Sequence, residues 1–264
     1  MKHPSRKIAL LIGAAIVFAS LAVGVAAAEP SGTAIMQAVY DRPQGKDMSG
    51  MLTMTLVDAK GKERVRGIKQ ITGSFDTMDK KLMVFQSPAD VRGTSFMNWS
   101  YAEQGRGDDQ WIYLPALKRV KRISSEGRGD NFMGSDFTYD DLGDRQPAED
   151  VHTLTGTEAV DGEACWVVES VPKDPKDLYS KTITWISKEK TVGLKRDYYD
   201  KRGTLLKTLR ISSIESISGV WVIKKTEMRN EQKKTSTRME FSEVKIDSGL
   251  VDGDFTERAM TKGL

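Results

Sequence analysis

The feature that most constrains the fold is a succession of short segments in which apolar and polar residues alternate. Alternation with a period of two is typical of β-strands. The segments are residues 48–58, 62–71, 80–86, 93–101, 110–114, 117–124, 151–159, 163–171, 182–187, 194–199, 205–214, 220–228 and 235–244. Short turns join most neighbours, which favours antiparallel pairing. We therefore predict a mainly β fold, one large antiparallel sheet of about a dozen strands that meanders and curls.

One helix is predicted, ahead of the first strand. Ser31 is suited to cap it, and Ile35, Met36 and Val39 fall on one face of residues 31–40. No helical crossovers separate the strands, and no linker or repeat marks a boundary. Residues 29–264 are therefore expected to form a single domain.

Residues 109–142 combine aromatic, basic and apolar side chains. Pro115 separates two short strands and predicts a tight hairpin, which would place Trp111 and Tyr113 beside a basic cluster. The cluster consists of Lys118, Arg119, Lys121 and Arg122. It can serve as a contact for an anionic headgroup or for a partner. The alternative is the solvated face of an edge strand, on which lysines also block aggregation.

A polar, glycine-containing segment then leads into a loop with closely spaced apolar residues. A loop that is so apolar is expected to cover something, and we predict a lid. Several strands are apolar on both faces, and eleven methionines follow residue 28. Flexible methionine side chains suit a cavity for variable apolar ligands, although they also serve as core filler. The candidates for lid and rim are Trp111, Tyr113, Phe132, Met133, Phe137 and Tyr139, and those for the cavity are Met54, Leu56, Met83 and Phe85.

Residues 1–28 have the layout of a secretory signal peptide. Lys2, Arg6 and Lys7 precede an uncharged run that ends in three alanines, the last of which is Ala28. Small residues at that point predict cleavage near Ala28. The alternative is a retained membrane anchor, because the run approaches the length that spans a bilayer.

Charge excludes one class of partner. Residues 1–28 hold three of the 40 basic residues and none of the 37 acidic ones, so the remaining chain carries 37 of each sign. Affinity for nucleic acid comes mainly from neutralising phosphates. A chain without net charge has no overall attraction of this kind, and nucleic acid is not expected as a ligand.

Residue types that build common catalytic sites are scarce. Cys165 is the only cysteine, so no disulfide can form within the chain, and its apolar neighbours predict a buried thiol. His152 is the only histidine after residue 28 and alternates like an ordinary strand residue, which excludes sites with several histidine ligands. The carboxylates that follow Ser135 match no calcium loop, and we interpret them as turn caps. No enzymatic activity, metal or cofactor is predicted.

Several longer motifs together resemble a known family. DAKGKERVR, FQSPADVRGTSF, WIYLPALKRVKRI, FMGSDFTYDDL, YSKTITW and YYDKRG occur in this order. The chain thereby resembles the LolA-like outer-membrane lipoprotein-sorting protein family of bacteria, over nearly all of residues 29–264. The resemblance implies a periplasmic protein whose open half-barrel, of the LolA/LolB type, holds acyl chains on a concave face under helices or loops. It also implies an association with RND-type or MMPL-type lipid exporters.

Two hypotheses about function follow. The first is a periplasmic carrier that shields the acyl chains of a lipid or lipoprotein and moves it between membranes or to and from an exporter. The second is an adaptor or sensor docked to an inner-membrane RND/MMPL-type transporter, with its concave face filled by its own side chains. In the second case residues 118–122 would be the interface. An enzyme ranks last, because no base, nucleophile or metal constellation is found.

Overall fold

The computed structural model describes residues 29–264, and the predicted signal peptide lies outside the described residues. Helix α1 (Gly32–Tyr40) forms where it is expected. The Ser31 hydroxyl accepts a hydrogen bond from the Ala34 nitrogen at 3.1 Å and so caps the first turn. Within the described residues, no helix has the length and apolar character needed to cross a membrane.

Thirteen strands within residues 29–264 form one antiparallel sheet, which confirms the predicted fold class. The first six are β1 (Asp47–Val57), β2 (Glu63–Phe75), β3 (Met78–Ser87), β4 (Ser95–Tyr101), β5 (Asp109–Leu114) and β6 (Arg119–Arg122). The others are β7 (Asp150–Val160), β8 (Glu163–Pro172), β9 (Lys181–Ser187), β10 (Gly193–Tyr199), β11 (Leu205–Ile217), β12 (Val220–Asn230) and β13 (Thr235–Ile246).

The sheet consists of two antiparallel meanders, β1–β6 and β7–β13, which are joined side by side where β1 pairs with β13. The strand order runs β6-β5-β4-β3-β2-β1-β13-β12-β11-β10-β9-β8-β7, so the first strand pairs with the last. The edge strands are therefore β6 and β7, which are consecutive in the sequence. Residues 123–149, which connect them, must pass from one edge of the sheet to the other. We call this segment the lid.

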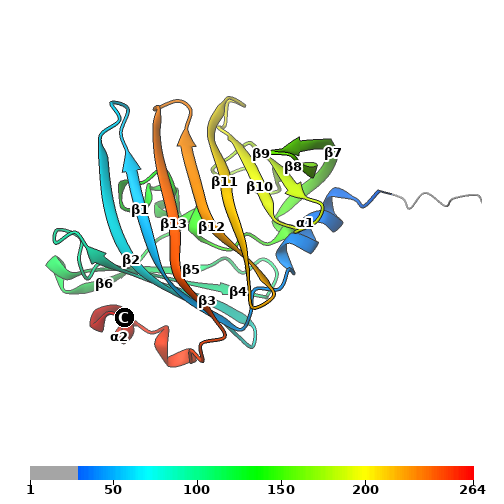
Figure 1. Cartoon of the computed structure of the whole chain (residues 1–264). Coiled ribbons are helices and arrows are strands. Elements are labelled where there is room, and N and C mark those ends of the chain that lie inside the picture. The colour runs from blue at the N-terminus through cyan, green and yellow to red at the C-terminus, as the bar shows by residue number, and fades with distance from the viewer. Residues whose placement is uncertain (1–28) are drawn as a thin grey trace, which may run out of the picture.

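The sheet is strongly bent, with β1 and β11–β13 standing steeply over β3–β5 (Figure 1). The lid lies inside the bend and contains four short 3₁₀ turns, including η3 (Phe132–Gly134) and η4 (Asp140–Leu142). Helix α2 (Glu257–Lys262) lies on the outside of the bend, below β2–β6 (Figure 1). We call the face under the lid the inner face and the opposite face the outer face.

The C-terminal segment explains why some strands are apolar on both faces. In β3, Met83 and Phe85 pack in the inner core, whereas Leu82 and Val84 pack in the outer core with the fully buried Phe255. Because the C-terminal segment covers the outer face, two-sided apolar strands do not by themselves indicate a ligand cavity.

Candidate functional site

The predicted cavity residues and most of the predicted lid residues lie together. Met54, Leu56, Met83 and Phe85 are buried on the inner face, in one cluster with Phe132 and Phe137 of the lid. Met133 and Tyr139 are partly buried against the same cluster. The Phe132 ring is fully buried, with its centroid 5.9 Å from that of Phe85 and 5.4 Å from that of Phe96. The lid thus fills the inner face with its own side chains.

Trp111 and Tyr113 lie elsewhere. They belong to the outer core, where the Trp111 ring centroid is 4.9 Å from that of Trp99. Alternation along β5 sends Ile112 to the inner face and both aromatic residues to the outer face. The structure therefore does not bring Trp111 and Tyr113 together with the other predicted lid and rim residues.

The β5–β6 hairpin is present, but its turn is longer than the predicted Pro115-Ala116 turn. The 3₁₀ turn η1 (Pro115–Leu117) connects the strands, and Lys118 has a left-handed backbone. The basic cluster is exposed along β6, an edge strand. Arg122, which is opposite Trp111 in the ladder, forms an ion pair with Asp109. The cluster is thus separate from the covered inner face.

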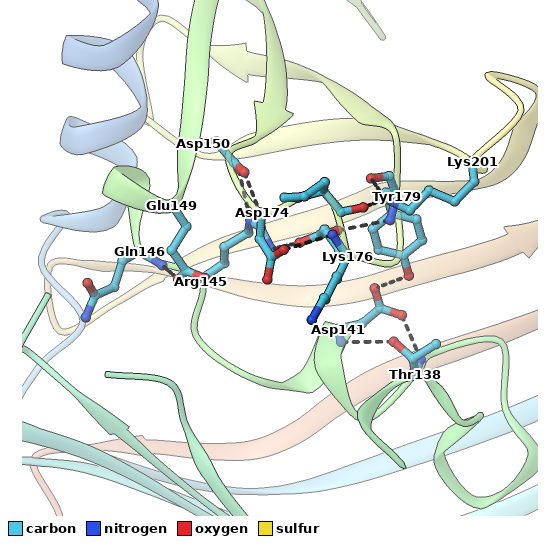
Figure 2. Close-up of polar contacts among 12 residues, drawn as sticks. Thr138, Asp141, Arg145, Gln146, Glu149, Asp150, Asp174, Lys176, Tyr179 and Lys201 are labelled. Atoms are coloured by element: carbon cyan, nitrogen blue, oxygen red, sulfur yellow. Dashed lines mark hydrogen bonds and ion pairs between the residues drawn. The ribbon is translucent and has the colours of Figure 1, made fainter. Parts of the chain in front are cut away.

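Buried polar side chains hold the lid to the sheet, and one of them is the side chain of Asp141. Its carboxylate accepts hydrogen bonds from the Tyr179 hydroxyl at 2.9 Å and from the Thr138 nitrogen at 2.7 Å (Figure 2). It also forms an ion pair with Lys207 of β11. Each of these two charged side chains is only 3% exposed. An ion pair this buried is sensitive to the loss of either partner.

Other polar side chains of the inner face bond to the lid backbone. Arg66 donates to the Met133 carbonyl at 2.6 Å, Lys81 to the Leu142 carbonyl at 2.8 Å, and Gln110 to the Tyr139 carbonyl at 2.9 Å. The Asp136 nitrogen donates to the Thr237 hydroxyl at 2.9 Å. Besides the backbone hydrogen bonds of its own turns, the lid thus depends on side chains of the strands for many of its partners.

The end of the lid is fixed near β7. The Arg145 guanidinium donates to both carboxylate oxygens of Asp150, at 2.9 and 2.5 Å, and to Asp177 at 2.8 Å. Figure 2 shows Arg145 reaching Asp150 at the start of β7. His152 is buried, and its Nε2 lies 2.9 Å from the Pro147 carbonyl oxygen, to which it can donate.

The sequence did not predict these hydrogen bonds and ion pairs between the lid and the sheet. The carboxylates of residues 136–141 were interpreted as turn caps, and only the reciprocal bonds between Thr138 and Asp141 are of that kind. Lys207 lies within the apolar run Leu205–Leu209, and this position could have indicated a buried lysine that needs an anionic partner. Within residues 29–264, no group of three or more His, Cys, Asp or Glu side chains is arranged to hold a metal ion.

Asp140 should respond to pH. Burial, followed by the nearby charges of Asp141 and Asp177, raises its pKa to about 6, against the opposing effect of Arg145 and Arg128. The folded pKa is above the unfolded one, so ionisation of Asp140 removes stability as the pH rises from about 4 to above 6. We expect Asp140→Asn to increase the free energy of unfolding at pH 7 by about 1 to 2 kcal/mol.

Urea unfolding of this variant and the wild-type protein at pH 7 and at pH 4 checks the expectation. The difference should be large at pH 7 and small at pH 4, where the wild-type carboxyl is protonated in the folded protein. Asp161→Asn is the matched control, because the Asp161 side chain is 70% exposed. An equal gain at both pH values would show that ionisation of Asp140 is not the cause.

Comparisons with known proteins agree with this fold. A domain from Vibrio parahaemolyticus described as one for outer membrane lipoprotein sorting is 33% identical, with a TM-score of 0.82 over 87% of this chain and 98% of that one. A DUF1329 family protein from Desulfovibrio piger is 32% identical, with a TM-score of 0.83 over 87% and 97%. A LolA superfamily protein from Nitrosomonas europaea is 18% identical, with a TM-score of 0.67 over 88% and 100%.

The fold is LolA-like, as the sequence motifs predicted. A family model described as one of an uncharacterized protein matches residues 77–262. The chain belongs to the family that includes the Vibrio parahaemolyticus domain and the DUF1329 protein from Desulfovibrio piger. A search of curated proteins found no match.

Proposed function

We propose that this protein is a non-enzymatic periplasmic carrier that holds the acyl chains of a lipid or lipoprotein between the inner face and the lid. The observation that carries the proposal is that an irregular lid, and not a helix or strand, covers a large apolar face. The signal peptide predicted in the sequence supports export. The Vibrio parahaemolyticus relative, described as an outer membrane lipoprotein-sorting domain, supports an acylated cargo.

Loading requires the lid side chains to leave the inner face. The side chains that leave are Phe132, Met133, Phe137, Tyr139 and Leu142. At about 1.5 to 3 kcal/mol for each buried apolar side chain, their packing contributes on the order of 10 kcal/mol. A sixteen-carbon chain contributes roughly 10 kcal/mol before its ordering costs. The exchange is close to balanced, which a carrier that must also release its cargo requires.

Uptake of a fluorescent fatty acid by delipidated protein tests the proposal. We expect saturable binding at micromolar probe, with displacement by unlabelled palmitate. The matched control is Leu117→Ala, because Leu117 is 68% exposed on the β5–β6 hairpin and takes no part in the inner core. Its probe affinity should equal that of the wild-type protein. Absence of probe binding to folded, delipidated protein would contradict the carrier.

The second candidate is the adaptor docked to an inner-membrane RND/MMPL-type transporter. One observation favours it: in this structure the inner face is filled by the side chains of the lid. An adaptor of this kind would keep the lid closed and bind no acyl probe. The uptake experiment therefore separates the two candidates.

A carrier or an adaptor must meet a membrane or a membrane protein, and the basic hairpin is suited to this contact. Lys118, Arg119 and Lys121 are exposed and have no ion-pair partner within the described residues, and the exposed Leu117 adjoins them. At about 1 kcal/mol for each basic residue near an anionic membrane, replacing all three by Gln should weaken vesicle binding about 100-fold.

Sedimentation with vesicles of phosphatidylcholine containing about 30% phosphatidylglycerol measures this effect at low salt. The matched control is the triple Gln variant of Lys60, Lys62 and Arg64, which are exposed on the β1–β2 hairpin. We expect the control to bind as the wild-type protein does. Equal loss in both variants would indicate that total charge, and not the position of the hairpin, governs binding.

A further inference from the structure

A second, polar cavity adjoins the apolar inner face. It has a volume of about 240 Å³ and lies between α1, the end of the lid and strands β7–β10. Tyr179 and Tyr198 line it, and both also belong to the inner-face core. The polar cavity therefore shares a wall with the space proposed for acyl chains.

Two arginines in this cavity have unused hydrogen-bond donors. Arg42 donates only to the Val39 carbonyl, at a long 3.5 Å, and its Nε is buried without a partner. Arg196 donates through Nε to the Thr184 hydroxyl at 2.9 Å. Neither guanidinium forms an ion pair with a carboxylate of the described residues. Two guanidinium groups without an ion-pair partner are suited to bind an anionic ligand.

Three of the five carboxylates that line the cavity are already paired with cations other than these two arginines. Asp141 is paired with Lys207, whereas Asp150 and Asp177 are paired with Arg145. Two further carboxylates, Asp144 and Asp140, form no ion pair within the described residues. Asp144 lies near Tyr40, Lys81 and Arg42, and Asp140 lies near the paired Arg145. Asp140 offers a place for a positively charged or hydroxyl-bearing part of a ligand.

We propose that this cavity binds the phosphate ester head of a lipid, with its phosphate on Arg42 and Arg196. The inference rests on the proposed carrier function, because the acyl chain would continue from the head past Tyr179 and Tyr198 onto the inner face. A volume of 240 Å³ holds about eight waters, which is enough for a headgroup but not for a whole lipid. The cargo is then a phospholipid and not the neutral diacylglyceryl group of a lipoprotein.

Calorimetric titration of delipidated full-length protein with three ligands tests this assignment. The ligands are palmitoyl-lysophosphatidylglycerol, monopalmitoylglycerol and glycerol 3-phosphate. We expect the first to bind at least about tenfold more tightly than the second, which has the same acyl chain but no phosphate. Glycerol 3-phosphate should bind far more weakly than either, because it lacks the acyl chain.

Variants localise the effect. Arg42→Gln and Arg196→Gln should each weaken binding of the lysophospholipid about tenfold and leave monopalmitoylglycerol within about twofold. Arg258→Gln is the matched control, because Arg258 is exposed on α2 at the outer face. Thermal unfolding shows whether each variant is folded. The comparison of ligands on the wild-type protein is valid even if a variant does not fold.

Each result has a distinct meaning. Equal affinity of the wild-type protein for the two acylated ligands would overturn the phosphate site and leave the carrier standing. No binding of either acylated ligand would overturn the carrier itself. Binding of glycerol 3-phosphate as tight as that of the lysophospholipid would show a site for a small phosphate ester, and the assignment to a lipid would be wrong.

Discussion

Joining the lid to the sheet by a disulfide is expected to abolish acyl-chain uptake. Asp136→Cys and Thr237→Cys are the substitutions of choice, made with Cys165→Ala to remove the native thiol. The Thr237 hydroxyl oxygen is 2.9 Å from the Asp136 nitrogen, so the two Cα atoms are within the roughly 7 Å that a disulfide spans. Because the closed lid occupies the inner face, a lid that cannot move leaves no room for an acyl chain.

The same protein provides its own control. Fluorescent fatty-acid binding should be absent in the oxidised form and should return after reduction. The Thr237→Cys variant without its partner cysteine should bind probe in either state, which separates the effect of the bridge from that of the substitution. Full uptake by the oxidised protein would show that acyl chains enter elsewhere, and lid displacement would be wrong.

Removing Asp141 is expected to have the largest effect on stability. Asp141→Ala leaves the Lys207 ammonium buried without a counter-ion, and breaking a buried pair in this way costs about 3 to 5 kcal/mol. It also removes the acceptor of the Tyr179 hydroxyl and of the Thr138 nitrogen. Lys207→Met should cost less, because Asp141 keeps both of these donors. Urea unfolding gives the free energies.

A double variant tests whether the cost comes from the unpaired charge. Replacing Asp141 by Leu and Lys207 by Met removes both charges, and its stability should be within about 2 kcal/mol of the wild-type value. If Asp141→Ala unfolds at the same urea concentration as the wild-type protein, the pair does not support the closed state. Faster hydrogen exchange confined to residues 123–149 would then show that the lid opens independently of the sheet.

The disulfide and the Asp141 variants both act on the equilibrium between a closed lid and an open one. The apolar side chains of the lid contribute about as much burial free energy as an acyl chain would. They alone therefore cannot decide whether the lid or a cargo covers the inner face. The hydrogen bonds and ion pairs between the lid and the sheet are specific to the closed state, because an acyl chain cannot replace them. The strength of these bonds sets how much binding free energy a lipid must supply to displace the lid.

Much of the fold could be predicted from local pattern. The alternating segments correspond to the thirteen strands, and the expected cap at Ser31 and helix through Tyr40 are present. Apolar residues at 132, 133, 137 and 139 indicated a covering loop, and they lie on the inner face. These features were accessible because alternation, capping and turn formation depend on neighbouring residues.

Local sequence pattern could not predict the face of the sheet on which β5 presents its aromatic residues. Trp111 and Tyr113 alternate correctly, but alternation only states that they share a face. Which face is inner depends on where the lid and the C-terminal segment pack. The hairpin turn was also misjudged, since Pro115–Leu117 forms a 3₁₀ turn and β6 starts only at Arg119.

The sequence by itself determined that this chain builds a large antiparallel sheet with a helix before it and an apolar cover. Only the tertiary structure decided that β1 pairs with β13, which makes β6 and β7 the edges and sends the lid across the inner face. It also decided that Asp141 meets Lys207, and that Arg42 and Arg196 share one cavity. Such partners are distant in sequence, and their contact depends on strand order, which no local pattern specifies.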